Sequence, residues 1–147
     1  MVALTERLRA AMTEARKRRD PARTLLLSTI LSDIKNREIE LHRDPSDDET
    51  AEVLRRGVKR RREAAEQYTG AGRAELAERE LAEVRMLEEF LPPVVGDDEV
   101  RAAVREAMAA GARDIGAVMG QVMPRFKCRA DGKVVNRIVR EELAAAS

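Results

Sequence analysis

Aromatic residues are almost missing from this chain, which has no tryptophan, one tyrosine and two phenylalanines among 147 residues. A hydrophobic core must therefore consist of aliphatic side chains, and a hydrophobic content of 44% is enough to form one. Alanine, leucine, glutamate and arginine dominate, and these residues lose little conformational freedom on entering a helix. There are no alternating runs rich in threonine, tyrosine and phenylalanine, the pattern typical of strands. The composition predicts an all-α fold.

Cysteine and histidine are equally scarce. Cys128 is the single cysteine, which excludes an internal disulfide and fits a reducing compartment. His42 is the single histidine, whereas zinc sites and helical di-metal carboxylate sites need several such ligands. Glu38 and His42 lie one helical turn apart, and we interpret them as a surface pair. No glycine-rich phosphate loop is present either. We therefore predict no metal and no cofactor.

Long apolar runs are also lacking. The longest leucine run covers residues 25–27, far too short to span a bilayer. The N-terminal region has no apolar signal core, and Glu6 and Glu14 interrupt its arginines, which argues against a transit peptide. We expect a cytoplasmic protein without membrane contact. The formal net charge is +1, from 28 basic and 27 acidic residues, so any attraction to nucleic acid has to be local.

Helix start and stop signals divide the chain into seven predicted helices. Asp20 followed by Pro21 is a helix start, and Ser46 with Glu49 has the form of a capping box. The first two predicted helices cover residues 3–18 and 21–42. The third runs from the capping box to a break at residues 70–72, and the fourth runs from that break to Pro92. The last three cover residues 97–111, residues 114–123 and the residues from Asp131 onward. Pro92 and Pro124 are expected to close the fourth and sixth helices.

Two domains are predicted. The segment from Pro92 to Gly96 is the one convincing boundary, because it combines two prolines with a glycine between helical patterns. We expect an N-terminal helical bundle over residues 1–93 and a small three-helix C-terminal domain over residues 94–147.

Four stretches carry a resemblance to a known family. They are residues 34–39 (Ile-Lys-Asn-Arg-Glu-Ile), 59–61 (Lys-Arg-Arg), 80–92 (Glu-Leu-Ala-Glu, then Leu-Glu-Glu-Phe-Leu-Pro) and 129–136 (Arg-Ala-Asp-Gly-Lys-Val-Val-Asn). In this order the sequence resembles the YqeY-like family, which is related to the tail of the tRNA-dependent amidotransferase B subunit. Two positions depart from the family pattern: Cys128 stands where glycine is usual, and Phe90 where tyrosine is usual.

The resemblance implies a helical bundle followed by a helical tail, similar to the tail with which the amidotransferase B subunit contacts tRNA. It also brings a label of carbon–nitrogen ligase activity with glutamine as amide donor. Transamidation of that kind needs an ATP-dependent activation domain and a separate glutaminase subunit, and neither fits in 147 helical residues. We do not expect the chain to be an amidotransferase on its own. The expected partners are tRNA and an amidotransferase or another translation protein.

Arg61 interrupts an apolar stripe. The helical spacing of Leu54 and Val58 leads to Arg61, and a charge on a buried face needs a carboxylate partner. We favour a network that fixes helix register; the alternative is a polar pocket for a small amide or a nucleotide. The candidate members of this network are Lys35, Glu38, Lys59, Arg61, Glu80 and Glu83.

A second candidate site precedes and opens the last predicted helix. Free backbone N–H groups at a helix start, with a glycine that permits close approach, suit a phosphate. The candidate residues for RNA or phosphate binding are Arg125, Lys127, Arg129, Gly132, Lys133, Arg137 and Arg140. The alternative is an ordinary turn capped by Asp131.

The leading interpretation is a tRNA-associated accessory module, and the alternative is a helical protein–protein adaptor without RNA binding. An all-helical enzyme ranks third, because the sequence offers no acid, base and nucleophile with a shared geometry and therefore no catalytic residue.

Overall fold

The computed structural model describes residues 3–126 and 129–147. Over these ranges it contains seven α-helices and no strand, which confirms the all-α prediction. The helices are α1 (Leu4–Lys17), α2 (Pro21–Leu41), α3 (Asp47–Gly70), α4 (Ala74–Glu88), α5 (Asp97–Ala109), α6 (Ile115–Phe126) and α7 (Gly132–Ala146). Lys127 and Cys128, which the sequence singled out, lie outside the described residues.

The chain divides into two compact units, Met1–Leu91 and Pro92–Ser147. The domain boundary predicted from the sequence, between residues 93 and 94, lies two residues further along the chain. Each unit has a hydrophobic core of its own.

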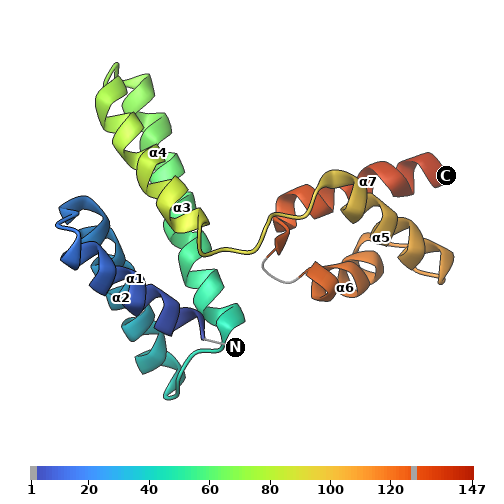
Figure 1. Ribbon diagram of the computed structural model, residues 1–147. Coiled ribbons are helices and arrows are strands. Elements are labelled where there is room, and N and C mark those ends of the chain that lie inside the picture. Colours follow the sequence, from blue (N-terminus) through green and yellow to red (C-terminus); the bar gives the residue numbers. More distant parts are fainter. Residues whose placement is uncertain (1–2, 127–128) are drawn as a thin grey trace. The chain divides into compact units, whose positions relative to one another are not determined.

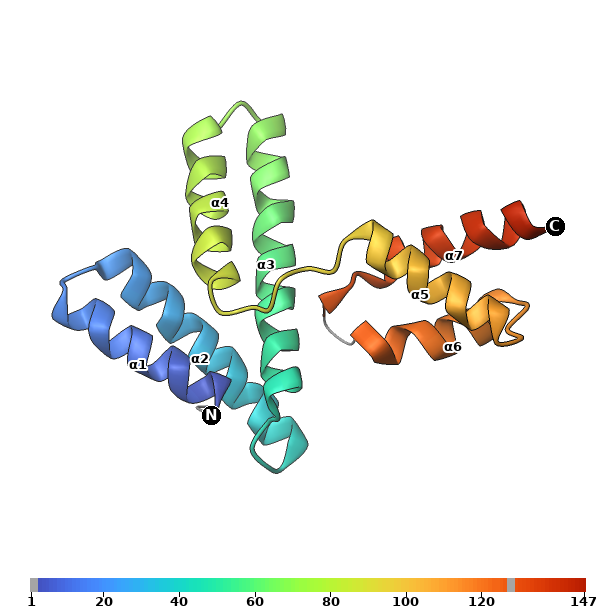
Figure 2. The same cartoon turned by 45° about the vertical axis from the view of Figure 1, so that its right-hand side comes forward.

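The N-terminal unit is built from two helical hairpins. Figures 1 and 2 show α1 beside α2, and α3 beside α4. Each helix contributes at least one fully buried side chain to the shared core: Leu8 from α1, Leu27 and Ile30 from α2, Leu54 from α3 and Leu87 from α4. These residues lie on the apolar stripes that the helical periodicity predicts. Tyr68, in the last turn of α3, is half-buried.

The C-terminal unit is a three-helix arrangement in which α5, α6 and α7 each pack against the other two. Its core is aliphatic, with Val104, Val118, Ile138 and Val139 completely buried. Phe126 closes the core at the end of α6 and is 3% exposed.

Two predicted helix starts are present as capped ends. The Asp20 side chain accepts a hydrogen bond from the Arg23 N–H at 3.1 Å, and Pro21 is the first residue of α2. At α3, the Ser46 hydroxyl accepts from the Glu49 N–H at 3.2 Å and the Glu49 carboxylate accepts from the Ser46 N–H at 2.9 Å. Both sequence signals are confirmed, because each satisfies N–H groups that the helix itself leaves free.

The end of α4 differs from the prediction. The helix stops at Glu88, and residues 89–91 form a turn in which the Phe90 N–H donates to the Leu87 carbonyl. The turn places the Phe90 ring, 8% exposed, in the N-terminal core, with the guanidinium groups of Arg7 and Arg23 at 5.9 and 5.6 Å from its centre. Burial of a large ring together with two cation–π contacts outweighs one further helical turn.

The end of α6 also differs. The helix continues through Pro124 to Phe126, although proline was expected to close it. Pro124 lies in the last turn, where its ring removes one helical hydrogen bond, and the continuation buries Phe126. Leu81 of α4 is an exposed leucine, with an exposed fraction of 36%. Among the described helices, none is long and apolar enough to cross a membrane.

The capping box at α3 should contribute measurably to stability. Replacement of Ser46 by alanine removes the bond to the Glu49 N–H and is expected to lower the free energy of unfolding by about 1 kcal/mol. Ser32, exposed in the middle of α2, is the matched control, because alanine there improves helix propensity by a few tenths of a kcal/mol. Urea unfolding followed by far-UV circular dichroism measures both; equal effects of the two substitutions would contradict the capping role of Ser46.

Glu49 should make stability depend on pH. Hydrogen bonds lower the pKa of Glu49 from 4.5 to about 2. The bond from Arg43 has the largest effect, and the bond from the Ser46 N–H follows. A carboxyl group whose pKa is lower in the folded state stabilises above its unfolded pKa, and this contribution disappears as the pH falls toward the folded pKa. The melting temperature of Glu49→Gln should therefore lie below that of the unmodified protein at pH 6. The difference should shrink between pH 4.5 and 2; a constant difference would contradict the assignment.

Candidate functional site

Arg61 forms the ion pair that the sequence predicts. Its Nε donates to Glu83 Oε2 at 2.8 Å, and the two side chains are 13% and 38% exposed. Arg61 Nη1 also donates to the Gly57 carbonyl at 3.0 Å. The pair joins α3 to α4 at the edge of the N-terminal core, where an unpaired guanidinium would carry a large desolvation cost.

Gly57 makes room for this arrangement. A Cβ atom at this position would lie 3.1 Å from Ile30 Cδ1 and 3.2 Å from Arg61 Nη1, closer than ordinary van der Waals contact. A glycine inside a helix is unfavourable by about 1 kcal/mol relative to alanine. The close approach of Ile30 from α2 and of the Arg61 side chain accounts for its presence here.

The other predicted members of the network lie apart from this pair. Lys35 Nζ forms a contact of 3.3 Å with Glu38 within α2, and the lysine is exposed. Lys59 is exposed and Glu80 is half-buried, and neither forms an ion pair within the part of the chain that the structure describes. The structure thus brings together Arg61 and Glu83, and leaves the remaining four candidates outside the pair.

An open groove of about 530 Å³ lies between α2 and α3. Arg60 of α3 reaches across it to Asp33 of α2, with 3.2 Å between Nη2 and Oδ2. Arg37 pairs with Glu40 within α2. Most of the charge that lines the groove is therefore compensated locally. Its lining includes Lys59 but not Arg61, so the predicted polar pocket around Arg61 does not coincide with this groove.

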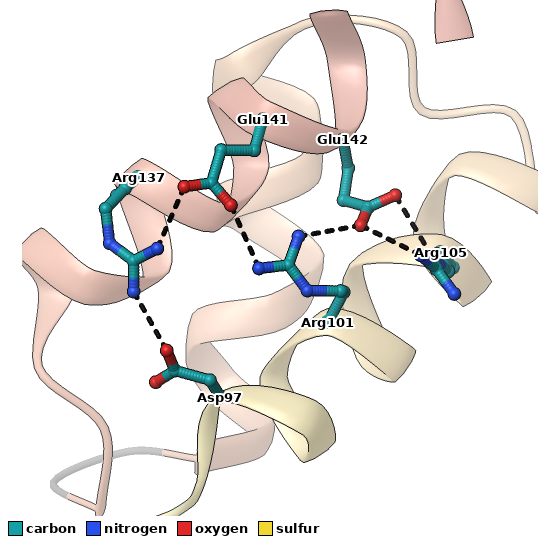
Figure 3. A network of polar contacts seen from close by, with 6 residues as sticks. All are labelled: Asp97, Arg101, Arg105, Arg137, Glu141 and Glu142. Carbon is teal, nitrogen blue, oxygen red and sulfur yellow. Dashed lines mark hydrogen bonds and ion pairs between the residues drawn. The ribbon is translucent and has the colours of Figure 1, made fainter. Parts of the chain in front are cut away.

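The C-terminal unit contains a longer ionic network that the sequence analysis missed. Figure 3 shows it as a chain of six alternating charges between α5 and α7. Arg137 lies between Asp97 at 3.0 Å and Glu141 at 2.9 Å, and Arg101 lies between Glu141 at 2.9 Å and Glu142 at 2.8 Å. Arg105 is the last member of this series of charges, with its Nε 3.1 Å from Glu142 Oε2.

The network fastens α5 to α7 through Glu142, whose side chain is 11% exposed. Hydrogen bonds lower the pKa of Glu142, with the larger effect from Arg105 and the smaller from Arg101. Hydrogen bonds from Arg101 and Arg137 likewise lower the pKa of Glu141. Both groups are thus held as carboxylates. Each positive charge has a negative neighbour, so this surface is a structural connection and not an anion-binding patch.

A signal for this network does exist in the sequence. Asp97, Arg101 and Arg105 recur every four residues, as do Arg137 and Glu141, which places each set on one helical face. The spacing alone does not show that the two helical faces oppose each other, because the paired residues are about 40 positions apart in the sequence.

The predicted phosphate-binding residues fall into two groups. Arg125 and Arg137 are engaged, Arg125 with Glu106 and Arg137 in the network. Arg129, Lys133 and Arg140 are exposed and form no ion pair with the described residues. Arg140 Nε donates only to the neutral Asn136 side chain, at 2.7 Å, and Arg129 Nη2 lies 3.5 Å from the Arg125 carbonyl. We refer to Arg129, Lys133 and Arg140 as the basic edge.

The start of α7 is occupied by its own cap. Asp131 Oδ1 accepts from the Lys133 N–H at 2.9 Å, and Gly132 is half-buried against Met123. The carboxylate fills part of the position that a phosphate would need and also repels it. The cap therefore disfavours a phosphate at this helix start.

Basic and acidic residues are unevenly distributed along the sequence of this unit. Residues 125–140 contain six basic residues and one acidic residue, whereas the rest of residues 92–147 contains three basic and seven acidic residues. Residues 125–140 are thus predominantly basic, although the total charge of the unit is close to neutral.

Comparison with known proteins identifies the family. The model of the family described as "Yqey-like protein" matches residues 5–143, nearly the whole chain. The chain belongs to the YqeY-like family. This confirms the resemblance found in the sequence. A similar protein is "Altered inheritance of mitochondria protein 41, mitochondrial" of Pyrenophora tritici-repentis (strain Pt-1C-BFP), which is 26% identical over 145 residues. The match covers 95% of this chain and 80% of that protein.

The Arg61–Glu83 pair of this YqeY-like protein should contribute to stability. Arg61→Ala is expected to lower the free energy of unfolding by about 2 kcal/mol. This is less than for a fully buried pair, because the carboxylate left behind regains water. Arg62→Ala is the matched control: Arg62 pairs with Glu88 at 3.1 Å with side-chain exposures of 55% and 40%, and its loss should cost less than about 1 kcal/mol. Chemical denaturation measures both, and equal losses would show that Arg61 acts as an ordinary surface residue.

Proposed function

We propose that this YqeY-like protein is a tRNA-associated accessory module whose C-terminal unit contacts the RNA backbone through the basic edge. The observation that carries the proposal is the presence of three exposed cations without a carboxylate partner among the described residues, next to a network that neutralises its own charges. Such cations are available to phosphate groups without the prior loss of an internal ion pair.

The contact should involve the backbone and not the bases. Phe126 is the only aromatic residue among residues 92–147, and it is 3% exposed, so no ring is available for base stacking. Arginine and lysine contacts to phosphates carry no sequence information by themselves. The binding is therefore weak, tolerant of sequence and strongly dependent on salt.

The module acts beside an amidotransferase or another translation protein and not as a ligase by itself. The family resemblance supports an association with tRNA-dependent amidation. The name of the Pyrenophora relative places that protein in mitochondria.

The basic edge can be tested by neutralisation. The triple variant Arg129→Gln, Lys133→Gln and Arg140→Gln should bind tRNA more weakly than the unmodified protein. The slope of log Kd against log salt should fall by about 2, since each phosphate contact contributes roughly 0.7–0.9. Fluorescence anisotropy with a labelled tRNA transcript at several salt concentrations gives both quantities.

The matched control removes three other exposed cations that have no carboxylate partner in the described residues: Lys59→Gln, Arg73→Gln and Arg79→Gln. This control should retain the affinity and the slope. Arg137 is left unchanged, because its replacement would break the α5–α7 network and confuse binding with folding. If the unmodified protein does not bind tRNA even at low salt, the protein-only adaptor is the better assignment.

A further inference from the structure

The last turn of α1 and the residues that follow it carry four consecutive basic residues, Arg16-Lys17-Arg18-Arg19. Arg18 Nε pairs with Glu14 at 3.0 Å, whereas Arg16, Lys17 and Arg19 are exposed and form no ion pair with the described residues. We refer to these three as the basic turn. It holds as many exposed cations as the basic edge, within four residues.

A second basic run of the same unit behaves differently. In α3, each of Arg56, Arg60 and Arg62 has a carboxylate partner, in the order Glu52, Asp33 and Glu88. The arginines of this run thus have carboxylate partners, whereas Lys59 is exposed and forms no ion pair with the described residues. The basic turn is not compensated in this way, and its positive potential extends into solvent.

The backbone at the basic turn gives a second argument. Arg19 has a φ of 58°, in the left-handed region, directly after the end of α1. Its N–H donates to the Arg16 carbonyl at 3.1 Å, and the Asp20 N–H donates to the Ala15 carbonyl at 2.9 Å, a closure that glycine usually provides. Helix termination favours glycine at this position, so the side chain of Arg19 is not explained by the fold.

A groove of about 530 Å³ lies beside these cations. Arg16 and Arg19 line it together with Asp20 and with Pro21, Thr24, Leu25 and Ser28 of α2. The groove thus combines two cations and two hydroxyl groups with one carboxylate, which already accepts the Arg23 N–H, and with two apolar side chains, of which Leu25 is 69% exposed. Hydroxyl and guanidinium groups bind phosphate oxygens, whereas one leucine and one proline offer little area for insertion into a membrane.

We propose that the basic turn and its groove form a second RNA-backbone site, so that the protein binds one RNA through both of its units. This rests on the proposed function of the basic edge. Two weak sites on one chain bind more tightly than either alone when both reach the same RNA, because the second contact forms at a high effective concentration.

The test neutralises the basic turn without harm to the fold. The variant Arg16→Gln, Lys17→Gln and Arg19→Gly removes three positive charges, and glycine suits the left-handed backbone at position 19. Its melting temperature should equal or exceed that of the unmodified protein. Its tRNA affinity should fall at least tenfold and its salt slope by about 2, measured as for the basic edge. The triple variant of Lys59, Arg73 and Arg79 is again the matched control.

The outcomes separate this inference from the proposed function. Loss of binding in both the basic-turn and the basic-edge variants supports two sites. Loss in the basic-edge variant alone overturns the second site, and loss in the basic-turn variant alone overturns the proposed function and keeps the second site. Equal binding by all variants, or no binding by the unmodified protein, overturns both. Binding of the basic turn to vesicles that contain phosphatidylserine, without binding to tRNA, would assign the turn to a lipid surface.

Discussion

A charged group that leaves water has to find opposite charges, and this requirement determines how the helices are joined in each unit. Arg61 in the N-terminal unit and Glu142 in the C-terminal unit are the charged side chains on which these connections depend, and both are more than four-fifths buried. Each binds a neighbouring helix: Arg61 of α3 binds Glu83 of α4, and Glu142 of α7 binds the arginines of α5. These directional contacts join particular positions of neighbouring helices, in addition to the packing of the aliphatic core.

Features encoded within one or two helical turns could be read from the sequence. The cap of α2 at Asp20 and the capping box of α3 depend on residues three positions apart, and both are present in the structure. The Arg61 pair could be predicted for a related reason, because a charge that interrupts an apolar stripe has to be neutralised wherever the partner comes from. The ends of α4 and α6 could not, since burial of Phe90 and of Phe126 decided them and the local sequence contains no information on that burial.

The candidate site was predictable only in outline. The basic character of residues 125–140 is evident from the sequence, but the sequence does not separate cations that are engaged from those that are available. Arg137 looks equivalent to Lys133 and Arg140 by helical spacing, yet Asp97 and Glu141 hold it on both sides. Selection among like charges requires knowledge of which helical faces oppose each other. For the same reason the sequence does not distinguish the basic turn from the basic run of α3, whose arginines pair with carboxylates.

The single tyrosine has a practical consequence. Tyr68 lies in α3, half-buried, and the chain has no tryptophan, so intrinsic fluorescence and near-UV absorption above the phenylalanine range originate from the N-terminal unit alone. The C-terminal unit, with Phe126 as its only ring, is optically silent in these measurements. A tyrosine signal therefore reports on the N-terminal unit alone, whereas a far-UV signal reports on the helices of both units. A transition that is seen in the far-UV curve and not in the tyrosine curve then belongs to the C-terminal unit.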